Sequence, residues 1–598
     1  MKIHFFDPFA NIWPHSYPVA RVIARFSELG HDLEVVRCRG AFSSHCVAMA
    51  AASVSFESSH MKKKLVCRSC RKRSDLIDDT GNSVIIHLDN EIEQDDLASA
   101  KRVAADLTAE NWSSIEFGGV PVGRIAAYEV FLTHKIDGIV IPESVWPEFQ
   151  ANFLNTVLIV IVSKRVLAKA KPDRVIVYNS LYALNNAYIS VAHLLGIPTF
   201  TLQGGPHISR RLSTLTCFSS PNEMFLSTYS NEASDWLSSP SDRETISIAS
   251  EHLQNLLLGE SAFAYSAESS GHSHSMISKK LGLLPERTVL VALLSSEDEL
   301  FAANLVGAIP RIDNWHGVFD SQNSWIKWLI EFAERQPELD LVIRIHPRLM
   351  PNKRENKVAP YARELADILS EVPKNVKVNW PSDKISLYDL MQQTDVVLNR
   401  RSSAGLEMMA YGLPVVVPGD EFLFSCPPDI CLVAKDQEEY RRLIIKAIND
   451  GWSIENTRNA LRWMGFIFRS TNVDVIKVKE NKIGSRRPKN SSLLIGLWKW
   501  LVFVYLQSGF MRSEKLQLLD IRSDLESVDE LIDTILGQHT GIHKIRRREM
   551  FGVSTLQDET NALFDDLEIR RSQLAGNNEV ESPLVAKIRF AHREFLKK

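Results

Sequence analysis

Residues 386–415 read SLYDLMQQTDVVLNRRSSAGLEMMAYGLPV, and this stretch shows most clearly which fold the chain adopts. The apolar run Val396–Asn399 has the composition of a strand, and Gly405–Tyr411 has the spacing of a helix. Between them lies a short turn that is rich in hydroxyl and basic groups. The free N–H groups at the start of such a helix point at whatever lies above the turn. The turn is therefore predicted to bind an anionic group such as a phosphate.

The same alternation of apolar strand and helix extends to both sides of this stretch. Strands that alternate with helices predict a parallel sheet with helices on its faces. The further strands are predicted at Thr288–Leu294, Leu339–Ile345, Val376–Trp380, Pro414–Val417 and Ile430–Val433. The helices are predicted at Ser324–Arg335, Leu387–Gln393 and Glu438–Asp450.

The first part of the chain shows this alternation too. The residues from Cys38 to Arg73 read as an irregular basic region, and those up to about residue 137 as mostly helical. The predicted strands are Lys2–Asp7, His31–Arg37, Arg174–Tyr178 and Ile197–Leu202, and the predicted helices are Tyr17–Leu29, 143–170 and Ala183–Leu195. The predicted fold class is α/β, with two Rossmann-like lobes and a helical C-terminal extension.

The chain has 598 residues, which is more than one hydrophobic core usually organises. We predict a first lobe at 1–240 with a cysteine-containing insertion at 38–73, and a second lobe at 284–474. Residues 241–283 turn polar and serine-rich, which predicts a linker between the lobes. Residues 475–598 show no strand pattern and are predicted to form the helical extension.

The composition argues against two classes of protein. The 69 basic and 73 acidic residues leave a net charge of −4, so we expect no nucleic-acid partner. Seven cysteines are too few for a disulfide scaffold, and the first residues lack the apolar core of a signal peptide. A cytoplasmic location is expected.

The ends of two strands of the second lobe, which we expect to be neighbours in the sheet, carry the residues that we predict to bind phosphate. His346 and Pro347 follow one strand, and Ser402 and Ser403 follow another. Ligands of open α/β sheets bind at these carboxyl ends. His346 is predicted to donate to a phosphate or to protonate a leaving group. The full predicted set is Arg344, His346, Pro347, Asn399, Arg400, Ser402, Ser403, Ala404 and Glu407, with Arg401 as an alternative source of charge.

In their order and setting, His346-Pro347 and Ser402-Ser403 resemble the His-Pro and Ser-Ser motifs of GT-B glycosyltransferases that build bacterial capsules and surface polysaccharides. The sialyl-, polysialyl- and polyol-phosphate transferases are related families. The resemblance covers about 284–450 well and 1–205 more loosely, and it leaves out about the last 120 residues. It implies that these motifs bind the phosphates of a UDP- or CMP-linked sugar and that Glu407 binds the donor ribose.

The resemblance also implies transfer of the sugar to a surface-polysaccharide or lipid-linked glycan acceptor held by the first lobe. The acceptor side is predicted at Asn179, Gln203, Gly204 and Gly205, which lie at or just beyond strand ends. No clear Asp-x-Asp pair is present, so no cofactor is expected for catalysis. The alternatives are a UDP-sugar 2-epimerase-like enzyme and a non-catalytic glycan-binding or scaffold subunit of the same fold.

The base that activates the acceptor has several candidates. The acidic pair followed by glycine that related families carry has no clean match in this sequence. Glu297 and Glu299 are candidates, although acidic residues at this place also suit the start of a helix. His207 in the first lobe is a rival candidate.

Four early cysteines could hold a structural zinc ion. Cys67 and Cys70 have the spacing with which two thiolates bind one tetrahedral ion, and Cys38 and Cys46 would complete the site. The wide gap between Cys38 and Cys46, and the basic residues around Cys67, favour instead an exposed loop without metal.

Residues 493–507 read LLIGLWKWLVFVYLQ, which is too short for a spanning helix and is interrupted by Lys499. Trp498 and Trp500 suit a helix that lies at a membrane surface, which would place the protein at the inner face of the membrane. A buried helix is the alternative.

Overall fold

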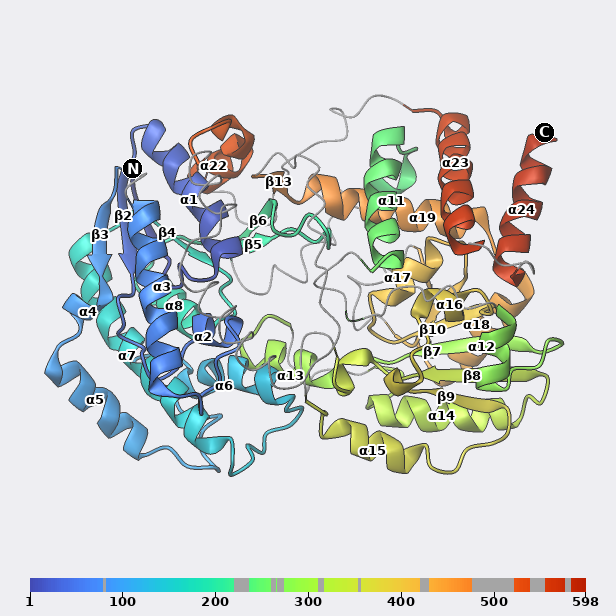
Figure 1. Ribbon diagram of the computed structural model, residues 1–598, viewed down its shortest axis with the longest axis horizontal. Helices are drawn as coiled ribbons and strands as arrows, with labels where there is room; N and C mark the ends of the chain where they lie inside the picture. The colour runs from blue at the N-terminus through green and yellow to red at the C-terminus, as the bar shows by residue number, and fades with distance from the viewer. Residues whose placement is uncertain are drawn as a thin grey trace, which may run out of the picture.

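Two sheets form the centre of the protein, one in each lobe (Figure 1). The computed structural model describes residues 1–78, 82–219, 236–259, 265, 274–309, 317–352, 357–419, 430–475, 521–537, 554–575 and 582–597. The strands of the first sheet have the order β13-β6-β5-β4-β1-β2-β3, and those of the second β12-β11-β10-β7-β8-β9. The α/β fold class with two lobes is thus confirmed.

In the first sheet, neighbouring strands are parallel except where β6 pairs with β5 and with β13. Strands β1 to β5 alternate with helices, as predicted, but β3, β6 and β13 were not expected from the sequence. Its strands are β1 (Lys2–Phe6), β2 (Asp32–Arg37), β3 (Val84–His87), β4 (Arg174–Tyr178), β5 (Thr199–Gly204), β6 (Thr214–Phe218) and β13 (Val473–Asp474).

The helices of the first lobe correct one prediction. The region 38–73 is not irregular, because its second half forms most of α3, and Cys67 and Cys70 lie on this helix. The helices are α1 (Trp13–Glu28), α2 (Val47–Ala51), α3 (His60–Asp78), α4 (Leu88–Glu91), α5 (Gln94–Ala105), α6 (Val122–His134), α7 (Trp146–Ala170) and α8 (Ala183–Leu194).

Within the described part of the chain, α7 is the one helix that is long and apolar enough to cross a membrane. It packs against α5, α6 and α8, and 61% of its most apolar window is buried inside the protein. This burial is typical of a core helix. The segment 493–507 lies outside the described residues, so its membrane contact stays a prediction.

The second sheet is parallel throughout, and each of its strands was predicted to within two residues of its ends. The strands are β7 (Thr288–Leu293), β8 (Leu339–Arg344), β9 (Val376–Asn379), β10 (Val396–Asn399), β11 (Val415–Val417) and β12 (Leu432–Val433). The helices are α12 (His274–Leu281), α13 (Glu297–Leu305), α14 (Gln322–Glu334), α15 (Tyr361–Ile368), α16 (Leu387–Met391), α17 (Ala404–Met409) and α18 (Gln437–Asp450).

The segments predicted as linker and extension are built into both lobes. Within 241–283, residues Arg243–Leu257 form helix α11, which packs on α19 (Ile454–Gly465) and on α23 (Leu556–Ala575). The remaining described elements are the 3-10 helices η2 (Pro347–Leu349), η3 (Pro381–Asp383) and η5 (Leu525–Val528), the π-helix η4 (Phe466–Ser470), and the helices α22 (Asp529–Leu536) and α24 (Pro583–Leu596). Figure 1 shows α23 and α24 beside the second lobe and α22 beside α1 of the first.

Candidate active site at the junction of the lobes

The two predicted phosphate-binding motifs lie at the same edge of the second sheet but not on neighbouring strands. Strand β7 lies between β8 and β10, so the expectation of adjacent strands is wrong. The register places Asn399, Leu293 and Arg344 side by side. With about 4.8 Å between strands, the two motif-bearing strand ends are about 10 Å apart. The residues that follow β7 therefore belong to the site.

The side chain of Asn399 holds the Ser402–Ser403 turn in shape. Its Oδ1 accepts from the backbone N–H of Ser402 at 3.1 Å, and its Nδ2 donates to the carbonyl of Ser402 at 3.0 Å. A Cβ at Gly405 would lie 2.4 Å from Asn399 Nδ2, so this close approach requires glycine. Ser402 Oγ accepts from Ala404 N at 3.3 Å, whereas the exposed Ser403 makes no side-chain cap to α17. The Ser403 hydroxyl thus faces solvent at the turn.

His346 is a neutral hydrogen-bond donor. Its Nδ1 accepts from Arg348 N at 3.3 Å, so the proton of the neutral ring is on Nε2. Burial lowers the pKa of His346 to about 4, and Arg348, Arg344 and Lys135 lower it further against the opposing effect of Asp298. The first predicted role, donation to a phosphate, fits this state. Protonation of a leaving group would need the charged ring, which this burial disfavours.

Three other residues that were predicted to bind the nucleotide sugar already form hydrogen bonds inside the lobe. Arg344 is buried and donates to Asn379 Oδ1 and, at 3.2 Å, to the carbonyl of Ile385; burial lowers its pKa to about 10. Arg400 is buried and donates to the carbonyl of Phe319 at 3.4 Å. Glu407 accepts from Tyr388 Oη at 3.0 Å, and burial raises its pKa to about 7.

Glu297, Asp298 and Glu299 follow β7 and form the first turn of helix α13. This agrees with the interpretation that these acidic residues begin a helix. They also lie between the two motifs. Glu297 Oε2 is 4.0 Å from Arg401 Nη1, and Glu297 Oε1 is buried without a hydrogen-bond partner. The buried Asp298 pairs with Arg348, with 2.8 Å between Oδ2 and Nη2.

Arg348 ties the two lobes together, which sequence reasoning missed although this residue directly follows the His-Pro motif. Its Nη2 donates to the carbonyl of Leu132, near the end of α6, at 2.7 Å. In return Lys135 donates to the carbonyls of Arg348 and, at 2.7 Å, Lys357. Figure 1 shows α6 and α13 next to each other where the lobes meet, and the rings of Phe131 and Phe301 stack 5.9 Å apart.

The predicted acceptor-side residues lie together at the carboxyl edge of the first sheet. Asn179 follows β4 with φ +54°, and its Oδ1 accepts from Leu181 N at 3.2 Å. Gln203 is buried on β5, and its Oε1 has no hydrogen-bond partner. A Cβ at Gly204 would lie 2.6 Å from the carbonyl of Arg211, and one at Gly205 would lie 2.1 Å from Thr214 Oγ1. Glycine suits both positions because the connection to β6 passes close to Gly204 and the first residue of β6 lies close to Gly205.

His207 is not placed to act as a base, so this candidate is withdrawn. It is 1% exposed, its Nε2 donates to the carbonyl of Ile248 at 3.2 Å, and its Nδ1 accepts from Arg210 N at 3.3 Å. Its ring packs against Phe468 and His252, with centroids 4.8 and 5.1 Å away. His207 thus joins the β5–β6 connection to α11 and η4.

This buried histidine predicts a loss of stability in mild acid. Burial lowers the pKa of His207 to about 4, whereas an unfolded histidine takes up a proton near pH 6.5. Between these values the unfolded chain binds more protons, so the free energy of unfolding falls as pH falls, by about 1.4 kcal/mol per pH unit for one such group. Urea unfolding between pH 7 and pH 4.5 measures this dependence. The free energy of unfolding should fall less steeply with falling pH in His207→Gln than in the wild type. Equal slopes for the two proteins would contradict this account.

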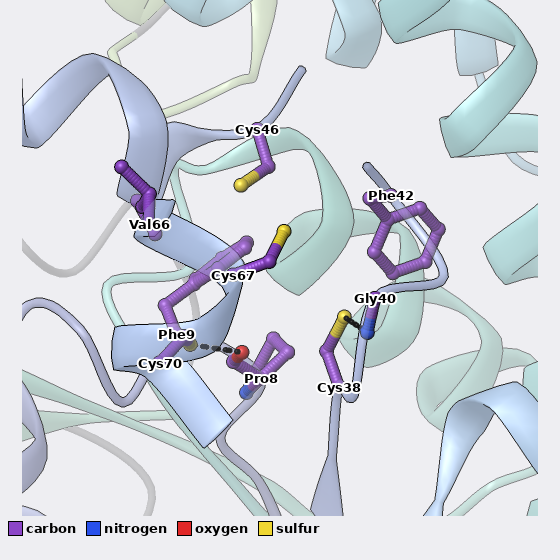
Figure 2. Close-up of a pocket in the computed structure, with 10 residues that line it drawn as sticks. Pro8, Phe9, Cys38, Gly40, Phe42, Cys46, Val66, Cys67 and Cys70 are labelled. Atoms are coloured by element: carbon purple, nitrogen blue, oxygen red, sulfur yellow. Dashed lines mark hydrogen bonds between the residues drawn. The ribbon is translucent and has the colours of Figure 1, made fainter. Parts of the chain in front are cut away.

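The four early cysteines line one small pocket beside the end of β1 (Figure 2). Figure 2 shows the sulfur atoms of Cys46 and Cys67 directed to the same space, but Cys70 Sγ points to the carbonyl of Pro8, 3.8 Å away. Burial raises the pKa of Cys38 to about 11 and that of Cys70 to about 12, which favours neutral thiols. Among the described residues, no three His, Cys, Asp or Glu side chains are placed to hold a metal ion. The zinc hypothesis gains no support from this arrangement.

Part of the second lobe matches a known family. Residues 313–426 match the family model described as capsule polysaccharide biosynthesis protein, and this range contains His346 and Ser402–Ser403. The predicted resemblance to capsule proteins is thereby confirmed for this segment. No curated protein matches the chain.

Several solved structures are similar over much of the chain at low identity. The UDP-GlcNAc 2-epimerase from Neisseria meningitidis bound to UDP-GlcNAc is 13% identical, with 78% of this chain and 97% of that chain covered and a TM-score of 0.26. The calicheamicin glycosyltransferase is 13% identical, with 79% of this chain and 94% of that chain covered and a TM-score of 0.24. The β-Kdo 2,4-transferase of Thermosulfurimonas dismutans is 14% identical, with 48% of this chain and 79% of that chain covered and a TM-score of 0.27. Such low TM-scores carry no argument about function.

Proposed function

We propose that this protein is a glycosyltransferase that moves a sugar from a UDP- or CMP-linked donor to a surface-polysaccharide or lipid-linked glycan acceptor. One observation carries the proposal. The segment that matches the capsule polysaccharide model ends two strands with a neutral histidine and a serine pair, at one edge of the second sheet. Hydrogen-bond donors at such an edge suit the phosphates of a nucleotide sugar.

The donor would bind to the second lobe. The hydroxyls of Ser402 and Ser403 and the Nε2–H of His346 would donate to its phosphates, and Arg401 would offset their charge. Because Arg344 and Arg400 are engaged inside the lobe, we give them the role of supporting the site. Glu407 would accept from the ribose, as the resemblance implies.

The acceptor would bind to the first lobe, beside Asn179 and Gln203. Such a reaction depends on holding two substrates across the junction and on stabilising the leaving phosphate. In this proposal the side chains that bind the phosphates supply that stabilisation without a catalytic metal ion. The protein would work in the cytoplasm, at the inner face of the membrane that carries the growing glycan.

A thermal-shift screen against UDP, CMP, GDP and their sugars tests donor binding. A nucleotide sugar at 100 times its Kd should stabilise the protein by about 2.7 kcal/mol. The double substitution Ser402→Ala and Ser403→Ala should remove this shift. Ser370→Ala is the matched control, because this exposed serine lies in the connection before β9, at the opposite edge of the sheet.

Product analysis with the ligand that shifts the protein then tests the reaction. Transfer to a glycan acceptor with release of the nucleotide supports the proposal. Change of the sugar without an acceptor would show an epimerase, and tight binding without any reaction would show a binding subunit.

A further inference from the structure

We propose that Glu129 of α6 is the general base that takes the proton from the acceptor hydroxyl, at the edge of the first sheet where β4 and β5 end. This proposal rests on the proposed function. It names a residue of the first lobe in place of Glu297, Glu299 and His207.

The position of Glu129 is fixed by the start of α8. Its Oε1 accepts from Ala183 N at 2.7 Å, and α8 begins just after β4 and the Asn179 turn. The carboxylate therefore lies at the carboxyl edge of the first sheet, beside the predicted acceptor-side residues. Glu129 is partly exposed, whereas the residues before and after it, Tyr128 and Val130, are buried. Glu129 is therefore the one of these three neighbouring residues that is not fully enclosed.

The surroundings of Glu129 differ from those of the other candidates. Glu297 faces the guanidinium group of Arg401, and Glu299 faces that of Arg348. Glu129 forms no ion pair in the part of the chain that the structure describes, and its other contact is Asn152 Nδ2 at 3.4 Å. A largely buried carboxylate without a cation beside it is uncommon, and such groups are candidates for a functional role.

The protonation of Glu129 also suits a general base. Burial raises its pKa to about 7, against the opposing hydrogen bonds from Ala183 N and Asn152. The titratable groups that face it are the phenols of Tyr128 and Tyr182, from its own helix and from the turn before α8. A base that titrates near the working pH is both available and strong enough to accept a proton.

The two tyrosines next to Glu129 lie near groups from both lobes. Tyr128 lies within electrostatic reach of Glu299 on α13 and of Arg211 on the connection between β5 and β6. The ring of Tyr182 lies 6.2 Å from His15, and His15 stacks on Tyr178 at 4.4 Å. Aromatic rings with a few polar groups among them are common in sites for small ligands.

The step balances with the groups present. Ionised Glu129 takes the proton of the acceptor hydroxyl, and the hydroxyl oxygen forms a bond to the anomeric carbon of the donor. The bond between that carbon and the phosphate oxygen breaks, and its electron pair leaves with the nucleotide. Glu129 afterwards returns the proton to solvent.

Glu129→Gln tests the proposal, because glutamine still accepts from Ala183 N but cannot ionise. We expect kcat for transfer to fall about 10²–10⁴-fold. In the wild type, kcat/KM should rise with pH through about 7, since the base must be ionised, and Glu129→Gln should lose this rise. The thermal shift given by the donor nucleotide should stay unchanged. Glu148→Gln is the matched control: this glutamate on α7 pairs with His134, and its variant should keep the pH profile.

Glu129→Asp is a second variant that tests the proposal if Glu129→Gln does not fold. It retains a carboxylate at a changed distance, so it should keep the rise with pH at a reduced kcat. Wild-type rate and profile in Glu129→Gln would overturn the proposal, and so would loss of the rise in Glu297→Gln alone. Failure of the proposed function looks different: the wild type would then bind nucleotide sugars but transfer nothing.

Discussion

Arg348→Ala is expected to lower the free energy of unfolding by about 3–5 kcal/mol and to abolish most of the transfer activity. The side chains of Arg348 and Asp298 are 3% and 2% exposed, so removing the guanidinium leaves a buried carboxylate without its partner. The variant also loses the hydrogen bond to the carbonyl of Leu132, which connects α6 to the second lobe. Urea unfolding and a transfer assay measure the two effects.

The control for this prediction is Arg335→Ala. The side chain of Arg335 is 62% exposed and lies 3.7 Å from Glu331 on the same helix, and such surface pairs contribute about 0–1 kcal/mol. If Arg348→Ala unfolds like this control and transfers sugar at the wild-type rate, Arg348 is not the link between the lobes.

Glu559→Ala is expected to cost a similar 3–5 kcal/mol and to release α23 from the second lobe. The fully buried carboxylate of Glu559 pairs with Arg462 and, at 3.1 Å, with Arg458 of α19. It also accepts from Ser241 N at 2.6 Å, so one side chain joins α23, α19 and the residues before α11. Its removal takes one charged partner from each of two arginines and leaves the backbone N–H of Ser241 without its acceptor. Urea unfolding gives the cost, and hydrogen exchange in 556–575 reports the release.

Glu568→Ala is the matched control on the same helix. The side chain of Glu568 is 41% exposed and pairs with Arg571, three residues further on. We expect a loss below about 1 kcal/mol and unchanged hydrogen exchange. Equal effects of the two substitutions would mean that Glu559 does not anchor the extension.

The sequence predicts the second lobe well because parallel strands that are buried on both faces are continuous apolar runs. The strands 288–293 and 396–399 are of this kind, and their polar successors indicated the edge at which a ligand would bind. The first lobe was harder to predict. The exposed, charged face of α3 hid a helix in the region 38–73, and β3 is short and only partly buried.

Sequence patterns were enough to predict the strands of the second lobe, their alternation with helices and the strand ends that carry His346 and Ser402. Those properties depend on neighbours along the chain, which periodicity reveals. The tertiary structure alone decided that β7 separates the two motifs, that Arg344 and His207 are engaged inside the lobes, and that Glu129 lies at the start of α8. These facts depend on contacts between residues that are 35 to more than 100 positions apart, and local patterns do not encode such pairings.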